Sequence, residues 1–70
     1  MKVVELVHQP VELYKILKFE GVADSGAAAK FTIAEGLVLV NGEIETRKRR
    51  KIVAGDIIDV AEDQFIIQLK

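Results

Sequence analysis

Hydrophobic residues recur with two different periods along the chain, and each period predicts one kind of element. Val and Leu dominate residues 2–7, which predicts a short strand. A stripe with the i, i+3, i+4 spacing of a helix follows, formed by Leu13, Ile16 and Leu17. This helix is expected to open at Gln9-Pro10, because proline suits the first helical turn, with Glu12 near its positive end. Gly21 is a natural helix stop.

A second helix is predicted after a link of only a few residues. Asp24 or Ser25 can cap it, since either side chain can accept a hydrogen bond from the free amides of a first helical turn. The i, i+4 spacing of Ala29 and Ile33 makes them the inward pair, and Gly36 ends the helix. Two helices joined this closely predict a helix-turn-helix or αα-hairpin.

The second half of the chain has the pattern of strands. Residues 37–40 form a buried-strand pattern, Asn41-Gly42 is a strong hairpin-turn signal, and residues 43–46 are the expected partner strand. Further turns and strands are predicted at residues 54–56 (turn), 57–60 (strand), 62–63 (turn) and 65–69 (strand). The order predicts an α+β fold, with a helix-turn-helix pair packed on a small, mostly antiparallel sheet.

The composition limits the class of protein. With 70 residues, half of them hydrophobic, we expect residues 1–70 to form one small domain. There is no Cys and only one His, which excludes a thiol nucleophile and a Cys-based zinc site and disfavours a Ser–His–Asp set. No apolar run is long enough to cross a membrane. We therefore expect a cytoplasmic protein that is not an enzyme and has no cofactor, metal or membrane partner.

The net charge of −1 conceals one concentrated cationic segment. Five consecutive basic residues stand in it: Arg47, Lys48, Arg49, Arg50 and Lys51. Without them the chain carries five basic and eleven acidic side chains, a net charge of −6. Such a run suits a polyanion, with nucleic acid as the first candidate. The alternative is a solvated charged face that pairs with acidic residues of the same chain, namely Glu43, Glu45 and Asp56.

Side-chain alternation gives the basic segment a testable geometry. If the strand at residues 43–46 continues, Arg47 and Arg49 point to one side, and Lys48 and Arg50 point to the other. One set would then bind phosphates while the other positions the loop.

Residues 11–60 resemble the RNA-binding domain named after ribosomal protein S-four. That family combines a leucine-striped helix, a Ser before a second helix with an inward Ala, Gly-x-Val-x-Val-Asn-Gly, and Gly-Asp before a strand. The matching residues here are Leu13, Leu17, Ser25, Ala29, Ile33, Gly36, Val38, Val40, Asn41, Gly42, Gly55 and Asp56. The SGAAAK segment (Ser25–Lys30) and the basic stretch after VNGEIET are similar to the small, stand-alone bacterial form of this domain.

The resemblance implies an αL motif, in which two helices and a hairpin form an L-shaped basic surface for structured RNA, rRNA included. One position departs from the family pattern. The family usually has Arg directly after the Ser, and this chain has Gly26, which offers no donor to a phosphate. The basic segment at residues 47–51 would have to supply the missing cations.

Three residues outside the basic segment are further candidates for RNA contact. Lys30 either faces the RNA or is an ordinary solvated lysine. Phe31 lies off the inward stripe, and it either stacks on an unpaired base or packs under a neighbouring strand. Ser25 caps the second helix, whose free amides could alternatively bind an anion.

Two functions follow from these observations. The first is a monomeric RNA-binding module that recognises structured RNA through a basic helix and hairpin surface. The second is a protein-interaction module whose basic patch docks an acidic partner. RNA binding should weaken steeply with salt, because the protein displaces condensed counterions from the phosphates. Protein docking should instead bury an apolar centre and leave naked RNA unbound.

Overall fold

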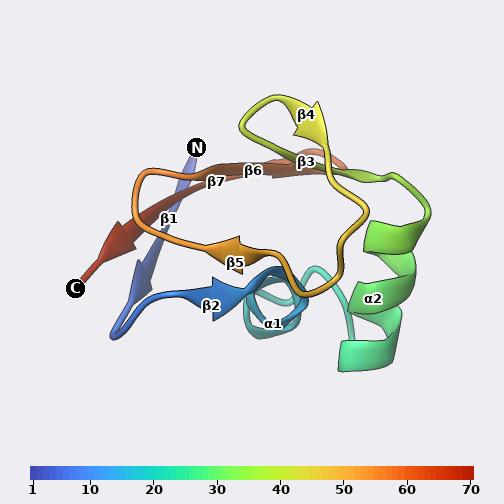
Figure 1. The fold of residues 1–70 in the computed structure, drawn as a ribbon, viewed down its shortest axis with the longest axis horizontal. Helices are drawn as coiled ribbons and strands as arrows, with labels where there is room; N and C mark the ends of the chain where they lie inside the picture. The colour runs from blue at the N-terminus through green and yellow to red at the C-terminus, as the bar shows by residue number, and fades with distance from the viewer.

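The structure is a computed structural model that describes all 70 residues, Met1–Lys70. Two helices lie against one face of a five-stranded sheet whose strand order is β1-β7-β6-β3-β4 (Figure 1). The strands of this sheet are β1 (Lys2–Leu6), β3 (Val38–Val40), β4 (Glu43–Ile44), β6 (Ile57–Val60) and β7 (Asp63–Leu69). The helices are α1 (Leu13–Phe19) and α2 (Gly26–Ala34). A separate antiparallel pair joins β2 (Val11–Glu12) to β5 (Lys51–Ile52).

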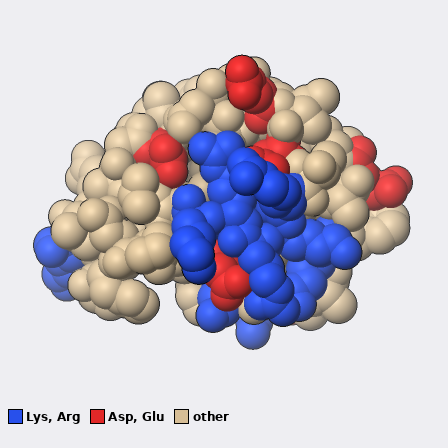
Figure 2. Space-filling model, in the orientation of Figure 1, with Lys and Arg blue, Asp and Glu red and all other residues tan.

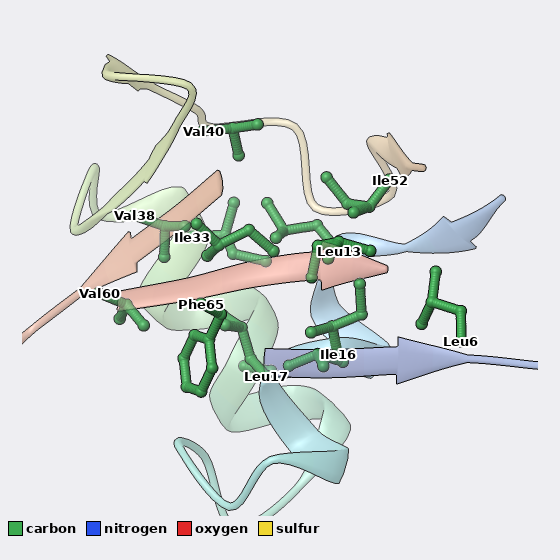
Figure 3. Close-up of a cluster of buried hydrophobic side chains, with 14 residues drawn as sticks. Leu6, Leu13, Ile16, Leu17, Ile33, Val38, Val40, Ile52, Val60 and Phe65 are labelled. Atoms are coloured by element: carbon green, nitrogen blue, oxygen red, sulfur yellow. The ribbon is translucent and has the colours of Figure 1, made fainter. Parts of the chain in front are cut away.

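The predicted α+β arrangement of a helix pair on a mostly antiparallel sheet is confirmed. Only β1 and β7 run parallel, while the other neighbours in the sheet are antiparallel. Alternate residues of the strands and the inner stripes of both helices meet in one core of 14 buried hydrophobic residues (Figure 3). Ala29 and Ile33 have no exposed surface, as their i, i+4 spacing predicts. Burial of each large aliphatic side chain contributes about 1.5–3 kcal/mol.

The hairpin turn between β3 and β4 is tied to the turn before β6. Asn41 and Gly42 both have positive φ, at 53° and 85°, as the turn signal predicts. The Asn41 amide also donates to Asp56 Oδ1 at 3.0 Å and accepts from the backbone amide of Ile57 at 2.9 Å. Asp56 Oδ2 accepts from the backbone amide of Val53 at 3.0 Å. The Asn-Gly and Gly-Asp motifs are therefore parts of one hydrogen-bonded unit.

The predicted start of the first helix at Gln9-Pro10 is wrong. That peptide bond is cis, and residues 11–12 form the strand β2 instead of a helical turn. Helix α1 begins at Leu13, so Glu12 is its N-cap residue rather than a member of the first turn. Pairing of β2 with β5 holds the backbone extended up to Glu12, and this long-range contact overrides the local preference of proline.

Two predicted boundaries in the second half also differ from the structure. Strand β4 ends at Ile44 rather than at residue 46, because the Glu45 side chain turns inward and accepts a hydrogen bond from the backbone amide of Arg47. Residues 61–62 form the turn that was predicted at residues 62–63, and β7 begins at Asp63. Both changes are small, but the first one determines the shape of the basic segment.

Candidate nucleic-acid interface

Residues 47–51, which we call the basic run, connect the sheet to the helices and to β5 (Figure 1). The backbone amide of Arg50 donates to the carbonyl oxygen of Arg47 at 3.3 Å, so the run contains a turn instead of an extended strand. The strand does not continue into the run, so the condition under which Arg47 and Arg49 would point one way and Lys48 and Arg50 the other is not met. Arg47 and Arg50, which were assigned to opposite sides, instead share a single carboxylate, that of Glu45.

Glu45 is the buried anchor of the basic run. Its Oε2 accepts from the backbone amide and the Nε of Arg47, at 2.9 and 3.0 Å. Its Oε1 accepts from Arg47 Nη2 and Arg50 Nη1, both at 2.9 Å. Only 6% of this residue is exposed. The hydrogen bonds from Arg47 lower the pKa of Glu45 to about 2, even though burial alone would raise it.

Of the three acidic residues considered as partners of the basic run, only Glu45 pairs with it. Asp56 is engaged in the turn before β6, and Glu43 forms no ion pair in the structure. The solvated-face alternative therefore holds for Arg47 and Arg50, which pair with Glu45, and leaves Lys48 and Lys51 without an ion pair.

The backbone of the basic run takes the place of a side-chain cap on α1. Backbone amides of Leu13 and Tyr14 donate to the carbonyl oxygens of Arg50 and Lys48, at 2.9 and 3.1 Å. The N-cap residue Glu12 makes no capping hydrogen bond through its side chain. Two of the amides that a helix leaves free at its start are thus satisfied by the run, which fixes the run against the helix.

This docking brings cations to the positive end of a helix, an unfavourable arrangement that Glu12 offsets. Glu12 Oε2 accepts from Arg49 Nη1 at 3.2 Å, and Glu12 Oε1 lies 3.3 Å from Lys15 Nζ. The hydrogen bond from Arg49 is the main cause that lowers the pKa of Glu12. The pairing of β2 with β5 places Glu12 opposite Lys51, so it also fixes Glu12 beside the run.

The ring of Tyr14 joins the second helix to this surface. Lys30 Nζ lies 4.6 Å from the ring centroid, Arg49 Cζ lies 5.3 Å from it, and Lys15 Nζ lies 6.0 Å from it. Cations at these distances are attracted to the electron-rich face of an aromatic ring. Gly26 lies next to the same ring, and a Cβ added there would stand 3.6 Å from Tyr14 Cε2.

The result is a surface with a large excess of positive charge. Figure 2 shows most of the visible Lys and Arg side chains gathered into one central patch with small acidic areas inside it. The five cations of the basic run, together with Lys15 and Lys30, surround only two carboxylates, those of Glu12 and Glu45. An open hollow of about 490 Å³ is lined only by Arg47, Arg49, Arg50 and Lys51. Such a hollow suits a phosphate group, because every residue in its lining is positively charged.

The three candidate residues outside the basic run, Lys30, Ser25 and Phe31, have different surroundings in the structure. Lys30 joins the surface through Tyr14. Ser25 is the N-cap of α2, and its Oγ accepts from the backbone amide of Ala28 at 3.1 Å. Phe31 is 66% exposed, which contradicts packing under a strand, and it lines no hollow of the structure. RNA contact by each of these residues stays a prediction.

The sequence names Glu45 as a possible partner of the basic run, and this pairing is confirmed, but a strand pattern does not indicate that its carboxylate is buried. A Glu two positions before the first Arg of a basic run is the signal that could have indicated it. The roles of Glu12 and Tyr14 in this surface are not predicted from the sequence. Glu12 and Tyr14 lie 37 and 35 positions before Arg49, and no local signal links residues that far apart.

The structure contains no cluster of metal ligands, since no three His, Cys, Asp or Glu side chains lie together. Neither helix is long and apolar enough to cross a membrane. The absence of a cofactor and of an enzymatic activity remains a prediction from the sequence.

Comparison with known proteins identifies the family. The family model described as S4 domain matches residues 4–68. The chain belongs to the S4 domain family. The resemblance seen in its motifs is thereby confirmed, and the match extends beyond residues 11–60 to include most of β1 and β7.

Bacterial relatives and a solved structure support this assignment. Protein YbcJ of Escherichia coli (strain K12), named as a candidate RNA-binding protein, is 57% identical over 54 residues, or 77% of each chain. RlbA of Bacillus subtilis (strain 168), named as a candidate ribosome maturation protein, is 38% identical over 50 residues, or 71% of this chain and 70% of RlbA. The solution structure of Escherichia coli YbcJ, described as revealing an αL motif involved in RNA binding, superposes with a TM-score of 0.74 at 48% identity. The superposition covers 97% of this chain and 87% of the YbcJ chain.

Proposed function

We propose that this S4 domain protein is an RNA-binding module that recognises structured RNA, with ribosomal RNA as the first candidate. Its contact surface consists of the basic run and Lys30. The protein would act in the cytoplasm as a monomer, with residues 1–70 as one module. The observation that carries the proposal is the hollow lined only by Arg47, Arg49, Arg50 and Lys51, held on a fixed backbone.

The fixed backbone supports recognition of shape rather than of sequence. Helical RNA hides its base edges in a deep groove and is read largely through phosphates and 2′-hydroxyls. Cations held in one arrangement can match phosphates at a set spacing, whereas a flexible basic tail binds any polyanion. Here Glu45 and the first amides of α1 fix the run from two sides.

The cations of the run divide into two groups. Arg47 and Arg50 are bonded to Glu45, so they define the loop and can reach a phosphate only with their remaining N–H groups. Lys48 and Lys51 form no ion pair within the structure. We therefore expect the two lysines to contribute phosphate contacts at little cost to the folded state.

The same surface does not favour an acidic protein as the partner. The centre of a protein interface is depleted in charged residues and enriched in aromatic side chains. The hollow of the basic run has no hydrophobic residue in its lining. Docking of an acidic protein is therefore the outcome that remains if RNA does not bind.

The test measures fluorescence anisotropy with a labelled rRNA hairpin, a single-stranded RNA and a DNA duplex. Titrations at about 50 mM and about 200 mM salt are compared for the parent and the double variant Lys48→Gln/Lys51→Gln. The hairpin should bind best. Four phosphate contacts predict a loss of affinity of about 100-fold between the two salt concentrations, using a slope near −0.9 per contact. For the double variant, the dependence of affinity on salt should weaken to the slope expected for about two phosphate contacts instead of four.

A matched control variant changes the net charge by the same amount, but at two lysines outside the proposed RNA-binding surface. The variant Lys18→Gln/Lys70→Gln removes two lysines that line neither hollow and form no ion pair. It should bind RNA nearly as the parent does. Equal losses in the two double variants would mean that total charge drives binding. That result, or no binding of any probe at low salt, would overturn the proposal.

A further inference from the structure

A second hollow of about 320 Å³ adjoins the basic run on the side of β2 and α1. Seven residues line it: His8, Pro10, Val11, Glu12, Lys15, Phe19 and Lys51. Unlike the hollow of the basic run, it combines two kinds of wall. Pro10, Val11 and Phe19 supply apolar surface, and Lys15 and Lys51 supply positive charge.

Phe19 is the unusual member of this lining. It is the last residue of α1, and 69% of it is exposed, whereas Ile16 one turn earlier is almost fully buried. The fold therefore gains little from an aromatic ring at this position. An exposed ring in a hollow that two lysines also line has the chemistry that holds a nucleobase, because the base stacks on the ring while cations meet its phosphate.

The two hollows are parts of one surface. Lys51 lines both of them. Glu12 lines the second hollow and also binds Arg49 of the first, with 3.2 Å between Oε2 and Nη1. A ligand whose phosphates occupy the basic run can therefore extend into the second hollow without leaving the protein.

We propose that the second hollow binds one unpaired nucleotide next to the helical RNA held by the basic run. This inference rests on the proposed function and specifies its substrate as a duplex with a bulge or a single-stranded end. A base inside a regular duplex is stacked on both faces and cannot reach the Phe19 ring. Stacking was one of two alternatives for Phe31, but Phe31 lines neither hollow, whereas Phe19 lines the same hollow as Lys15 and Lys51.

The experiment compares a blunt RNA duplex with the same duplex carrying one bulged nucleotide, a 3′ overhang or a 5′ overhang. Anisotropy gives the affinity of each probe, and 2-aminopurine at the unpaired position reports stacking by its fluorescence. We expect at least one unpaired probe to bind about tenfold more tightly than the blunt duplex. Phe19→Ala should abolish this preference, and Phe19→Tyr, which keeps a ring, should retain it.

Controls separate this inference from the proposed function. Leu37→Ala removes a side chain that is 60% exposed and lines neither hollow, so it should leave every affinity unchanged. Salt-sensitive binding of the blunt duplex with no preference for any unpaired probe would overturn the nucleotide site and leave the RNA module intact. Loss of the preference in Phe31→Ala instead of Phe19→Ala would also overturn it. No binding of the blunt duplex at low salt would count against the RNA module itself.

Discussion

Two carboxylates meet the basic run, and they hold it in different ways. Glu45 is buried and accepts four hydrogen bonds, all from Arg47 and Arg50. Glu12 is more open, with 22% of its side chain exposed, and it shares its charge between Arg49 and Lys15. The first arrangement fixes the path of the loop. The second places Arg49 beside Tyr14, with its side chain 62% exposed.

The largest effect is expected from breaking the buried anchor. Glu45→Gln keeps the size of the side chain but replaces one acceptor oxygen with an N–H donor that faces guanidinium donors. We expect the free energy of unfolding to fall by about 2 kcal/mol, in the range for hydrogen bonds to a charged group. Urea denaturation measures this loss. Glu43→Gln, at an exposed residue without an ion pair, is the matched control and should unfold like the parent.

Acid should weaken the same anchor. The pKa of Glu45 is lowered in the folded state, from an ordinary value of 4.5 to about 2. A carboxylate with a lowered pKa stabilises the fold fully above its unfolded pKa, and that contribution is lost as the pH falls through the folded pKa. Thermal melts between about pH 5 and about pH 2 should show the loss, and Glu45→Gln should flatten it. The pKa of Glu12 is also lowered, so Glu12→Gln should flatten the curve less. Parallel curves for the parent and Glu45→Gln would contradict this explanation.

A substitution at Tyr14 tests how the more exposed part of the surface, around Glu12 and Arg49, is held. Tyr14→Leu removes the ring that lies near Lys30 and Arg49, and we expect the melting temperature to fall by about 2–4 °C. The RNA affinity should fall by a few fold, because these two cations lose the surface that positions them. Tyr14→Phe keeps the ring and should behave like the parent in both measurements. If Tyr14→Leu leaves RNA binding unchanged, Lys30 does not take part in the contact.

The smallest effect is expected from restoring the cation that the family usually has. A Cβ at Gly26 would be in ordinary contact with the Tyr14 ring, so Gly26→Arg fits without displacing the helix backbone. One added phosphate contact should raise RNA affinity by about twofold at low salt. Gly26→Ala has the same backbone change without the charge, and it should bind like the parent. An unchanged affinity of Gly26→Arg would place the RNA away from the start of α2.

Local chemistry made much of the fold predictable. The positive φ at Asn41 and Gly42, the Ser25 cap and the buried Ala29–Ile33 pair all depend on residues close together in the sequence. Such features follow from turn chemistry, capping and periodicity. The sheet pattern from residue 37 onward followed in the same way, with shifts of one or two residues at the strand ends.

The error at the start of α1 has its cause in contacts between distant parts of the chain. The pairing of β2 with β5 replaced the expected first turn of α1 and brought Glu12 to the basic run. Basic residues were located correctly from the sequence, but their division of roles depends on Glu45 being buried. Burial of one carboxylate is decided by packing, which charge patterns do not reveal.

The parallel pairing of β1 with β7 also affects how the chain folds while it is being synthesised. Lys2 to Leu6 pair with Phe65 to Leu69, and β1 has no other neighbour in the sheet. Strand β1 therefore has no partner in the sheet until β7 has been synthesised. Until then Val4 and Leu6 lack the strand that buries them, and an unpaired apolar segment is open to chaperones and proteases. A chain truncated before residue 65 would therefore leave β1 without a partner and its apolar side chains uncovered.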